Sequence, residues 1–94
     1  MQNTIDSFLQ ELRLERGLSS NTLEAYSSDL IQLNHYLIEN KLVKITTIRQ
    51  EHITKYLLYL SQTKKIKART LARKLTTLRL FFQFATQKNF LTEN

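Results

Sequence analysis

Basic side chains are concentrated in one segment in the last third of the sequence. The segment also contains the hydroxyl side chain of Thr76. The full set is Lys64, Lys65, Lys67, Arg69, Arg73, Lys74 and Thr76. Ammonium groups neutralise phosphates, and the guanidinium fork of arginine matches the geometry of a phosphate or of a guanine edge. The segment therefore predicts binding to a polyanion, with nucleic acid as the first candidate.

Residue types that perform catalysis or bind metals are scarce. The sequence has no cysteine, and its two histidines, His35 and His52, have no short ligand spacing. No serine lies in a GxSxG or SxxK context, and the single glycine, Gly17, cannot form a phosphate-binding loop. We therefore expect no catalytic residue, no cofactor and no metal site, and we interpret the chain as non-enzymatic.

The net charge of +6 is divided unevenly along the chain. Residues 1–40 carry two bases and six acids, a net charge of −4, whereas residues 41–94 carry twelve bases and two acids, a net charge of +10. Clustered bases and a sequence pI near 9.8 are typical of proteins that bind nucleic acid or an anionic membrane surface. A merely solvated surface would scatter both signs.

The elements that position these cations are expected to be helices. Ninety-four residues suffice for one domain. The absence of proline and the single glycine disfavour an all-β fold, and no apolar run is long enough to span a membrane. The composition indicates a soluble, cytoplasmic, all-α domain.

Apolar residues recur at helical spacing in four segments. Gly17 is placed to end the first helix, and Ser19, Ser20 and Asn21 are all candidate caps of the second. Residues 41–48 read as a connection rather than a strand. The expected helices cover about residues 4–16, 19–40, 50–61 and 68–87, and the apolar stripe of the last comprises Leu71, Leu75, Leu78, Phe82 and Ala85.

The last helix is expected to present its arginines to solvent. At about 100° per residue, Arg69, Arg73 and Thr76 lie opposite the apolar stripe and Lys74 lies on its flank. The two arginines are one turn apart and repel each other. No acid between Glu51 and Glu93 relieves this repulsion, which favours a functional role. An α-helix with such an N-terminal end fits the major groove of B-DNA.

Two runs in this sequence resemble tyrosine site-specific recombinases, the Xer-type and phage-integrase family. The first run is FLQELRLERGLSSNTLEAYSSDL at residues 8–30, and the second is RTLARKLTTLRLFF at residues 69–82. The segment YLLYL at residues 56–60 fits the third helix of the same module. The resemblance covers essentially the whole chain, in order and with appropriate spacing.

The resemblance implies a compact four-helix SAM-like bundle, the core-binding domain, over residues 1–88. Residues 89–94 would begin a linker to a C-terminal catalytic domain that this chain lacks. That domain would exchange DNA strands through a covalent 3′-phosphotyrosyl intermediate. The chain itself would be the DNA-binding arm that helps to grip a recombination half-site. Its partners would be double-stranded DNA, the catalytic domain and other recombinase protomers, and the isolated domain is expected to be a monomer.

In this family the second and fourth helices face the DNA. Carried over by position, this implies contacts from Ser20, Asn21 and Ser27 on the second helix and from Lys65, Lys67, Arg69, Arg73 and Lys74 on the fourth. Relatives often have a basic residue where this chain has Ser27 and Ser28, which predicts weaker phosphate contacts there.

Two other functions remain open. One is a helical protein-interaction module, for which Leu14, Leu58 and Leu80 would supply an apolar docking patch. The other is a free-standing regulator that binds DNA without catalysis.

Overall fold

The computed structural model describes residues 1–42 and 44–88 of the chain. It contains four α-helices and one short 3₁₀ turn within that range: α1 (Gln2–Arg16), α2 (Ser20–Glu39), η1 (Ile45–Thr47), α3 (Gln50–Gln62) and α4 (Ala68–Gln87). No strand occurs in the described part, so the expected all-α class is confirmed. Each helix begins and ends within two residues of its expected position. The expected linker at residues 89–94 lies outside the described residues.

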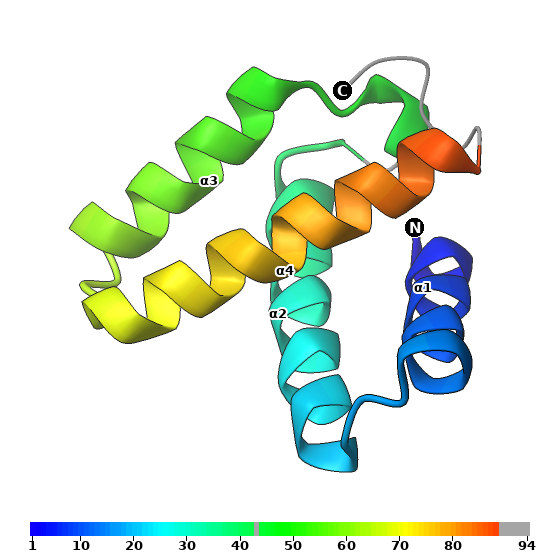
Figure 1. The fold of residues 1–94 in the computed structure, drawn as a ribbon. Helices are drawn as coiled ribbons and strands as arrows, with labels where there is room; N and C mark the ends of the chain where they lie inside the picture. The colour runs from blue at the N-terminus through cyan, green and yellow to red at the C-terminus, as the bar shows by residue number, and fades with distance from the viewer. Residues whose placement is uncertain (43, 89–94) are drawn as a thin grey trace.

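The helices form two antiparallel hairpins that cross each other (Figure 1). The first hairpin pairs α1 with α2, and the second pairs α3 with α4. Helix α4 crosses α2 and packs against all three of the other helices. The basic segment that opens α4 is therefore attached to the most extensively packed element of the fold.

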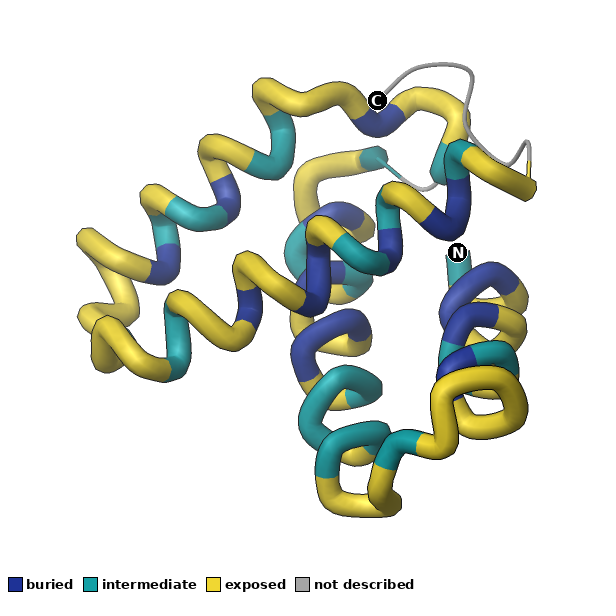
Figure 2. Tube along the Cα trace, viewed as in Figure 1, coloured by how far each residue is buried: buried dark blue, intermediate teal, exposed yellow. Residues whose placement is uncertain are grey.

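The core lies where α4 meets the first hairpin (Figure 2). The ring of Phe8 on α1 meets Phe81 edge-on, with 5.4 Å between ring centres, and meets Phe84 at 5.5 Å. Aromatic pairs of this geometry add to the free energy of apolar burial. The buried apolar residues are Ile5, Phe8, Leu12, Leu30, Leu33, Leu37, Ile48, Tyr56, Leu60, Leu78, Phe81, Phe84 and Ala85.

The inward face of α4 differs from the expected apolar stripe. Leu75 is 41% exposed, whereas Lys74 and Thr77 are buried. The buried face is rotated by about 80° from the stripe predicted by apolar spacing. The reason is that α2 offers polar partners to Lys74 and Thr77, so these two residues can occupy core positions that hydrophobicity alone would assign to leucines.

The helix ends follow local sequence signals. Gly17 ends α1 in the left-handed conformation, with φ 61° and ψ 32°. The hydroxyl of Ser19 accepts a hydrogen bond from the backbone N–H of Thr22, which identifies Ser19 as the cap of α2. Helix α4 starts after Lys67, whose side chain makes no capping hydrogen bond. The end that carries the cations therefore lacks the usual side-chain cap.

Candidate nucleic-acid interface

The turn between α3 and α4 gathers exposed cations at one end of the molecule. Lys64, Lys65 and Lys67 lie in this turn, Arg69 lies in the first turn of α4, and all four are exposed. The backbone N–H of Ile66 donates to the carbonyl of Leu60 at 3.2 Å, which ties the turn back to α3. We call these four cations the turn cluster.

Helix polarity reinforces the charge of the turn cluster. The N-terminal end of an α-helix carries a partial positive charge and unpaired amide groups. The first turn of α4 contains no acidic residue, and none of the four cations of the cluster forms an ion pair with another described residue. The cluster therefore presents uncompensated positive charge, which is the arrangement that attracts a phosphate backbone.

The outward positions expected for α4 are only partly confirmed. Arg69 and Thr76 are exposed, as expected. The side chain of Arg73 is 43% exposed and points toward α2, where it pairs with Asp29. The expectation that no acid relieves the two arginines is therefore wrong, because the neutralising acid comes from another helix.

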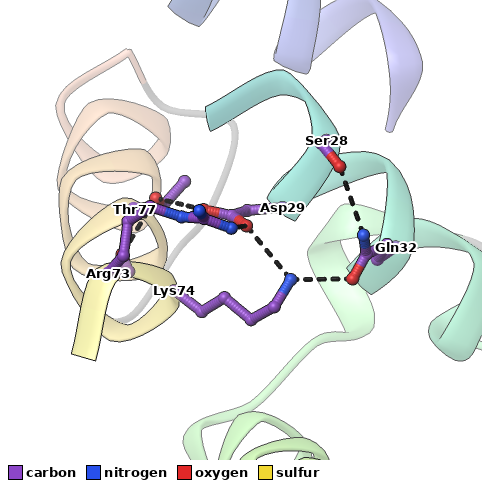
Figure 3. Close-up of polar contacts among 6 residues, drawn as sticks. All are labelled: Ser28, Asp29, Gln32, Arg73, Lys74 and Thr77. Carbon is purple, nitrogen blue, oxygen red and sulfur yellow. Dashed lines mark hydrogen bonds and ion pairs between the residues drawn. The ribbon is translucent and has the colours of Figure 1, made fainter. Parts of the chain in front are cut away.

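Asp29 on α2 receives four hydrogen bonds from three residues of α4 (Figure 3). The guanidinium of Arg73 donates side-on, from Nη2 to Oδ1 at 2.7 Å and from Nε to Oδ2 at 3.1 Å. Lys74 Nζ donates to Oδ1 at 3.0 Å, and the hydroxyl of Thr77 donates to Oδ2 at 2.8 Å. Each carboxylate oxygen thus accepts two hydrogen bonds, so the buried charge of Asp29 is fully partnered.

Lys74 is an internal residue, which corrects its expected place on the flank of the helix. Its side chain is 4% exposed, and its ammonium also donates to Gln32 Oε1 at 2.7 Å. Gln32 in turn donates to the hydroxyl of Ser28 at 3.2 Å (Figure 3). An ammonium committed to Asp29 and Gln32 is not available to a phosphate without breaking a buried ion pair.

Neighbouring charges set the protonation of this network. Burial raises the pKa of Asp29, but hydrogen bonds from Arg73, Lys74 and Thr77 outweigh burial, so the pKa lies below the ordinary value of 3.8. The hydrogen bond to Asp29 raises the pKa of Arg73. Both effects favour the charged forms, so the network is a permanent ion cluster at neutral pH.

The residues expected on α2 are not part of this network. Ser20 and Asn21 are exposed in the first turn of the helix, and Ser27 is half-buried. The structure connects Ser28, one position later, to α4 through Gln32. On a helix, adjacent positions lie about 100° apart, so Ser27 and Ser28 face different sides of α2.

Asp29 was not identified from the sequence, although a signal was present. The apolar stripe of α2 contains Leu30, Leu33 and Leu37, and Asp29 lies four residues before Leu33. Helical spacing places it on the edge of the buried face. A carboxylate there requires a cationic partner, and Lys74, three residues after Leu71, occupies the corresponding position on α4.

The leucines considered for protein docking do not form a patch. Leu14 is 69% exposed on α1 and Leu58 is 50% exposed on α3. These two helices lie at opposite sides of the fold (Figure 1), and Leu80 packs against the core. The structure therefore gives little support to an apolar docking surface built from these three residues.

A groove lies between α2 and α3 and extends to Lys64 of the turn cluster. It has a volume of about 910 Å³ and is lined in part by Tyr36, Tyr56 and Tyr59. The ring of Tyr36 lies 4.9 Å from that of Tyr56 and 5.5 Å from that of Tyr59. Burial, with a smaller contribution from nearby Asp29, raises the pKa of Tyr56 to about 12, so this phenol stays neutral.

The described residues offer neither a metal-binding group nor a membrane-spanning helix. No group of three or more histidine, cysteine or acidic side chains there could hold a metal ion. No described helix is both long and apolar enough to cross a bilayer.

Comparisons with known proteins place these features in a family. Residues 5–89 match the family described as phage integrase, N-terminal SAM-like domain. The chain is 40% identical over 78 residues to tyrosine recombinase XerC of Staphylococcus haemolyticus, which covers 83% of this chain and 26% of that protein. It is 36% identical to tyrosine recombinase XerD of Staphylococcus saprophyticus over 94 residues, which is all of this chain and 32% of that protein.

A more distant relative gives the same result. Tyrosine recombinase XerC of Herpetosiphon aurantiacus is 30% identical over the whole of this chain, which covers 30% of that protein. The search of solved structures found none that matches. The chain spans about a quarter to a third of the length of these curated relatives. With its four helices and its match over residues 5–89, the chain belongs to the phage integrase N-terminal SAM-like domain family, the N-terminal domain of tyrosine recombinases.

Proposed function

We propose that this chain is the DNA-binding arm of a site-specific tyrosine recombinase and grips one half-site of the recombination site. The observation that carries the proposal is the turn cluster, because Lys64, Lys65, Lys67 and Arg69 are exposed at the N-terminal end of α4 and form no ion pair with another described residue. Cleavage and exchange of strands would belong to a catalytic domain outside this chain, so the chain itself is non-catalytic.

The first turn of α4 is the part that approaches the DNA most closely in this proposal. Arg69 and Thr76 are exposed on α4 and reach the major groove or its phosphates. The lysines of the turn neutralise phosphates on either side. The first turn of α2, with Ser20 and Asn21, offers exposed polar groups to a second stretch of backbone.

Three residues that the sequence predicts to contact DNA have different places in the proposal. Arg73 contacts DNA only through the edge of its guanidinium that Asp29 does not occupy. Lys74 makes no direct contact, because its ammonium is buried against Asp29 and Gln32. Ser27, half-buried on α2, contributes at most at the margin of the interface.

The partners follow from the same family. Other recombinase protomers would bind the neighbouring half-site, and the isolated domain would be a monomer located in the cytoplasm.

A free-standing DNA-binding regulator is the alternative function that would use the same turn cluster. The reading frame beyond Asn94 separates the two, since a stop codon there supports the regulator.

The proposal is tested by titrating a fluorescently labelled duplex with the chain and following anisotropy at several salt concentrations. We expect affinity to fall steeply with salt, because each phosphate contact adds about −0.9 to the slope of log K against log salt. Arg69→Ala should weaken binding roughly tenfold and make the slope shallower by about one unit.

Arg79→Ala is the matched control. Arg79 is also exposed on α4, but it lies ten residues further from the turn than Arg69. Its replacement by alanine removes the same charge as Arg69→Ala. We expect its effect on affinity to be several times smaller than that of Arg69→Ala. Equal losses for the two variants would show that binding depends on net charge alone and would contradict the proposed interface.

A further inference from the structure

The guanidinium of Arg73 is held on one edge and open on the other. Its Nε and Nη2 groups bind the two oxygens of Asp29, while Nη1 has no hydrogen-bond partner among the described residues. The carboxylate is buried, with a side-chain exposure of 0%, whereas 43% of the arginine side chain is exposed. The same two hydrogen bonds therefore fix the plane of the guanidinium and direct its remaining donors away from the core.

The carboxylate of Asp29, which holds Arg73, is itself fixed in place. Asp29 is held by Lys74 and by Thr77 as well as by Arg73 (Figure 3). Thr77 and Lys74 lie in the buried face of α4, and Asp29 lies beside the core residue Leu30 of α2. A carboxylate with four donors on two oxygens has little freedom to rotate.

We propose that Asp29 is a positioning residue for DNA binding: it orients Arg73 so that Nη1 meets a backbone phosphate without further ordering of the side chain. The inference rests on the proposed function, since it concerns how one cation of that interface is presented. An exposed arginine loses much conformational freedom when it binds, and an arginine already fixed by a bidentate contact loses less.

The opposite role for Asp29 makes the opposite prediction. If the carboxylate only neutralised Arg73, or competed with phosphate for it, then removing the carboxylate would strengthen DNA binding. It would also raise the net charge by one unit, which favours a polyanion. If Asp29 positions Arg73, removing the carboxylate weakens binding although the net charge becomes more positive. The sign of the change therefore separates the two roles.

The experiment is a double-mutant cycle of Asp29→Asn and Arg73→Ala, read by anisotropy on the same labelled duplex. We expect each single variant to bind roughly tenfold more weakly, about the effect of one charge-assisted hydrogen bond. Asp29→Asn should have little further effect when Arg73 is already alanine. Glu24→Gln is the matched control for charge, because Glu24 is an exposed acid of α2, and it should leave binding unchanged or slightly stronger.

A second variant covers the case in which Asp29→Asn does not fold. Arg73→Lys keeps the positive charge and leaves Asp29 in place, but an ammonium cannot be held by two parallel hydrogen bonds. We expect Arg73→Lys to lose most of the affinity that Arg73→Ala loses. Far-ultraviolet circular dichroism at the temperature of the titration shows which variants are folded.

The outcomes are distinguishable from failure of the proposed function. Absence of binding by the wild-type chain at low salt overturns both. Binding that depends on Arg69 supports the proposed function, and the inference is then overturned alone if Asp29→Asn tightens binding. It is also overturned if Arg73→Ala has no effect, or if Arg73→Lys binds like the wild type.

Discussion

Asp29 and Lys74 are both charged and both buried, and each would destabilise the fold if it were alone. Their pairing with Arg73 and Thr77 satisfies every acceptor site of the carboxylate. Replacing one partner of such a buried pair typically costs about 3–5 kcal/mol, because an uncompensated charge remains. The network therefore fixes how α4 lies across α2.

The network makes stability depend on pH in acid. The pKa of Asp29 is lowered in the folded state, so its contribution is fully present above the ordinary value of 3.8 and is lost as the pH falls through the folded-state pKa. We expect the difference in free energy of unfolding between the wild type and Asp29→Asn to shrink over this acidic range. Urea unfolding from neutral pH downward measures it, and a difference independent of pH would argue against a charged Asp29.

This pairing could not be predicted in detail from the sequence. Asp29 and Arg73 are 44 positions apart, and their contact depends on how two hairpins cross. The local pattern did predict the exposure of Arg69 and Thr76, because they lie away from both possible buried faces of α4. It failed for Lys74, because apolar spacing assigns a lysine to the surface when its partner is unknown.

At the scale of elements, the four helices could be predicted because local signals agree with the packing. Gly17 adopts the left-handed conformation that ends α1, and Ser19 caps α2. The rotation of α4 could not be predicted, because Leu75 and Lys74 are adjacent and only the tertiary partner decides which one is buried.

The start of α4 shows a conflict between stability and charge. Lys67 occupies the cap position with φ −67° and ψ 149° but makes no side-chain cap. Serine fits this backbone and would cap the helix, so Lys67→Ser should stabilise the fold by about 0.5–2 kcal/mol. In a domain of this size, 1 kcal/mol raises the melting temperature by about 4–8 °C.

The same substitution should weaken DNA binding. Lys67→Gln is the control, since it removes the charge without supplying the cap. We expect both variants to lose DNA affinity in the anisotropy titration and only Lys67→Ser to melt at a higher temperature. A serine variant no more stable than the glutamine variant would count against the missing cap.

At the scale of the whole molecule, the two hairpins carry opposite charge. Residues 1–40, which include α1 and α2, have a net charge of −4, and the rest of the chain has a net charge of +10. Ion pairs join the basic hairpin to the acidic one at Asp29, which pairs with Arg73 and Lys74, and at Glu11, which pairs with Lys88. Repulsion among the cations of the turn cluster is left unrelieved, because none of them has an ion-pair partner among the described residues.

Salt should therefore affect folding and binding in opposite directions. Between about 20 and 300 mM KCl, screening of the exposed cations should raise the melting temperature by a few degrees. DNA affinity should fall over the same range. Differential scanning calorimetry and the anisotropy titration, performed in matched buffers, measure the two trends. A melting temperature that falls with added KCl would mean that attractive ion pairs dominate the surface.

The tyrosine cluster between α2 and α3 has an optical consequence. The sequence contains no tryptophan and four tyrosines, and three of them lie in this cluster with ring centres 4.9 and 5.5 Å apart. The intrinsic ultraviolet emission of the chain therefore comes mostly from the contact between α2 and α3. Separation of those rings changes the emission, so the chain carries an unlabelled reporter of whether its two hairpins remain together.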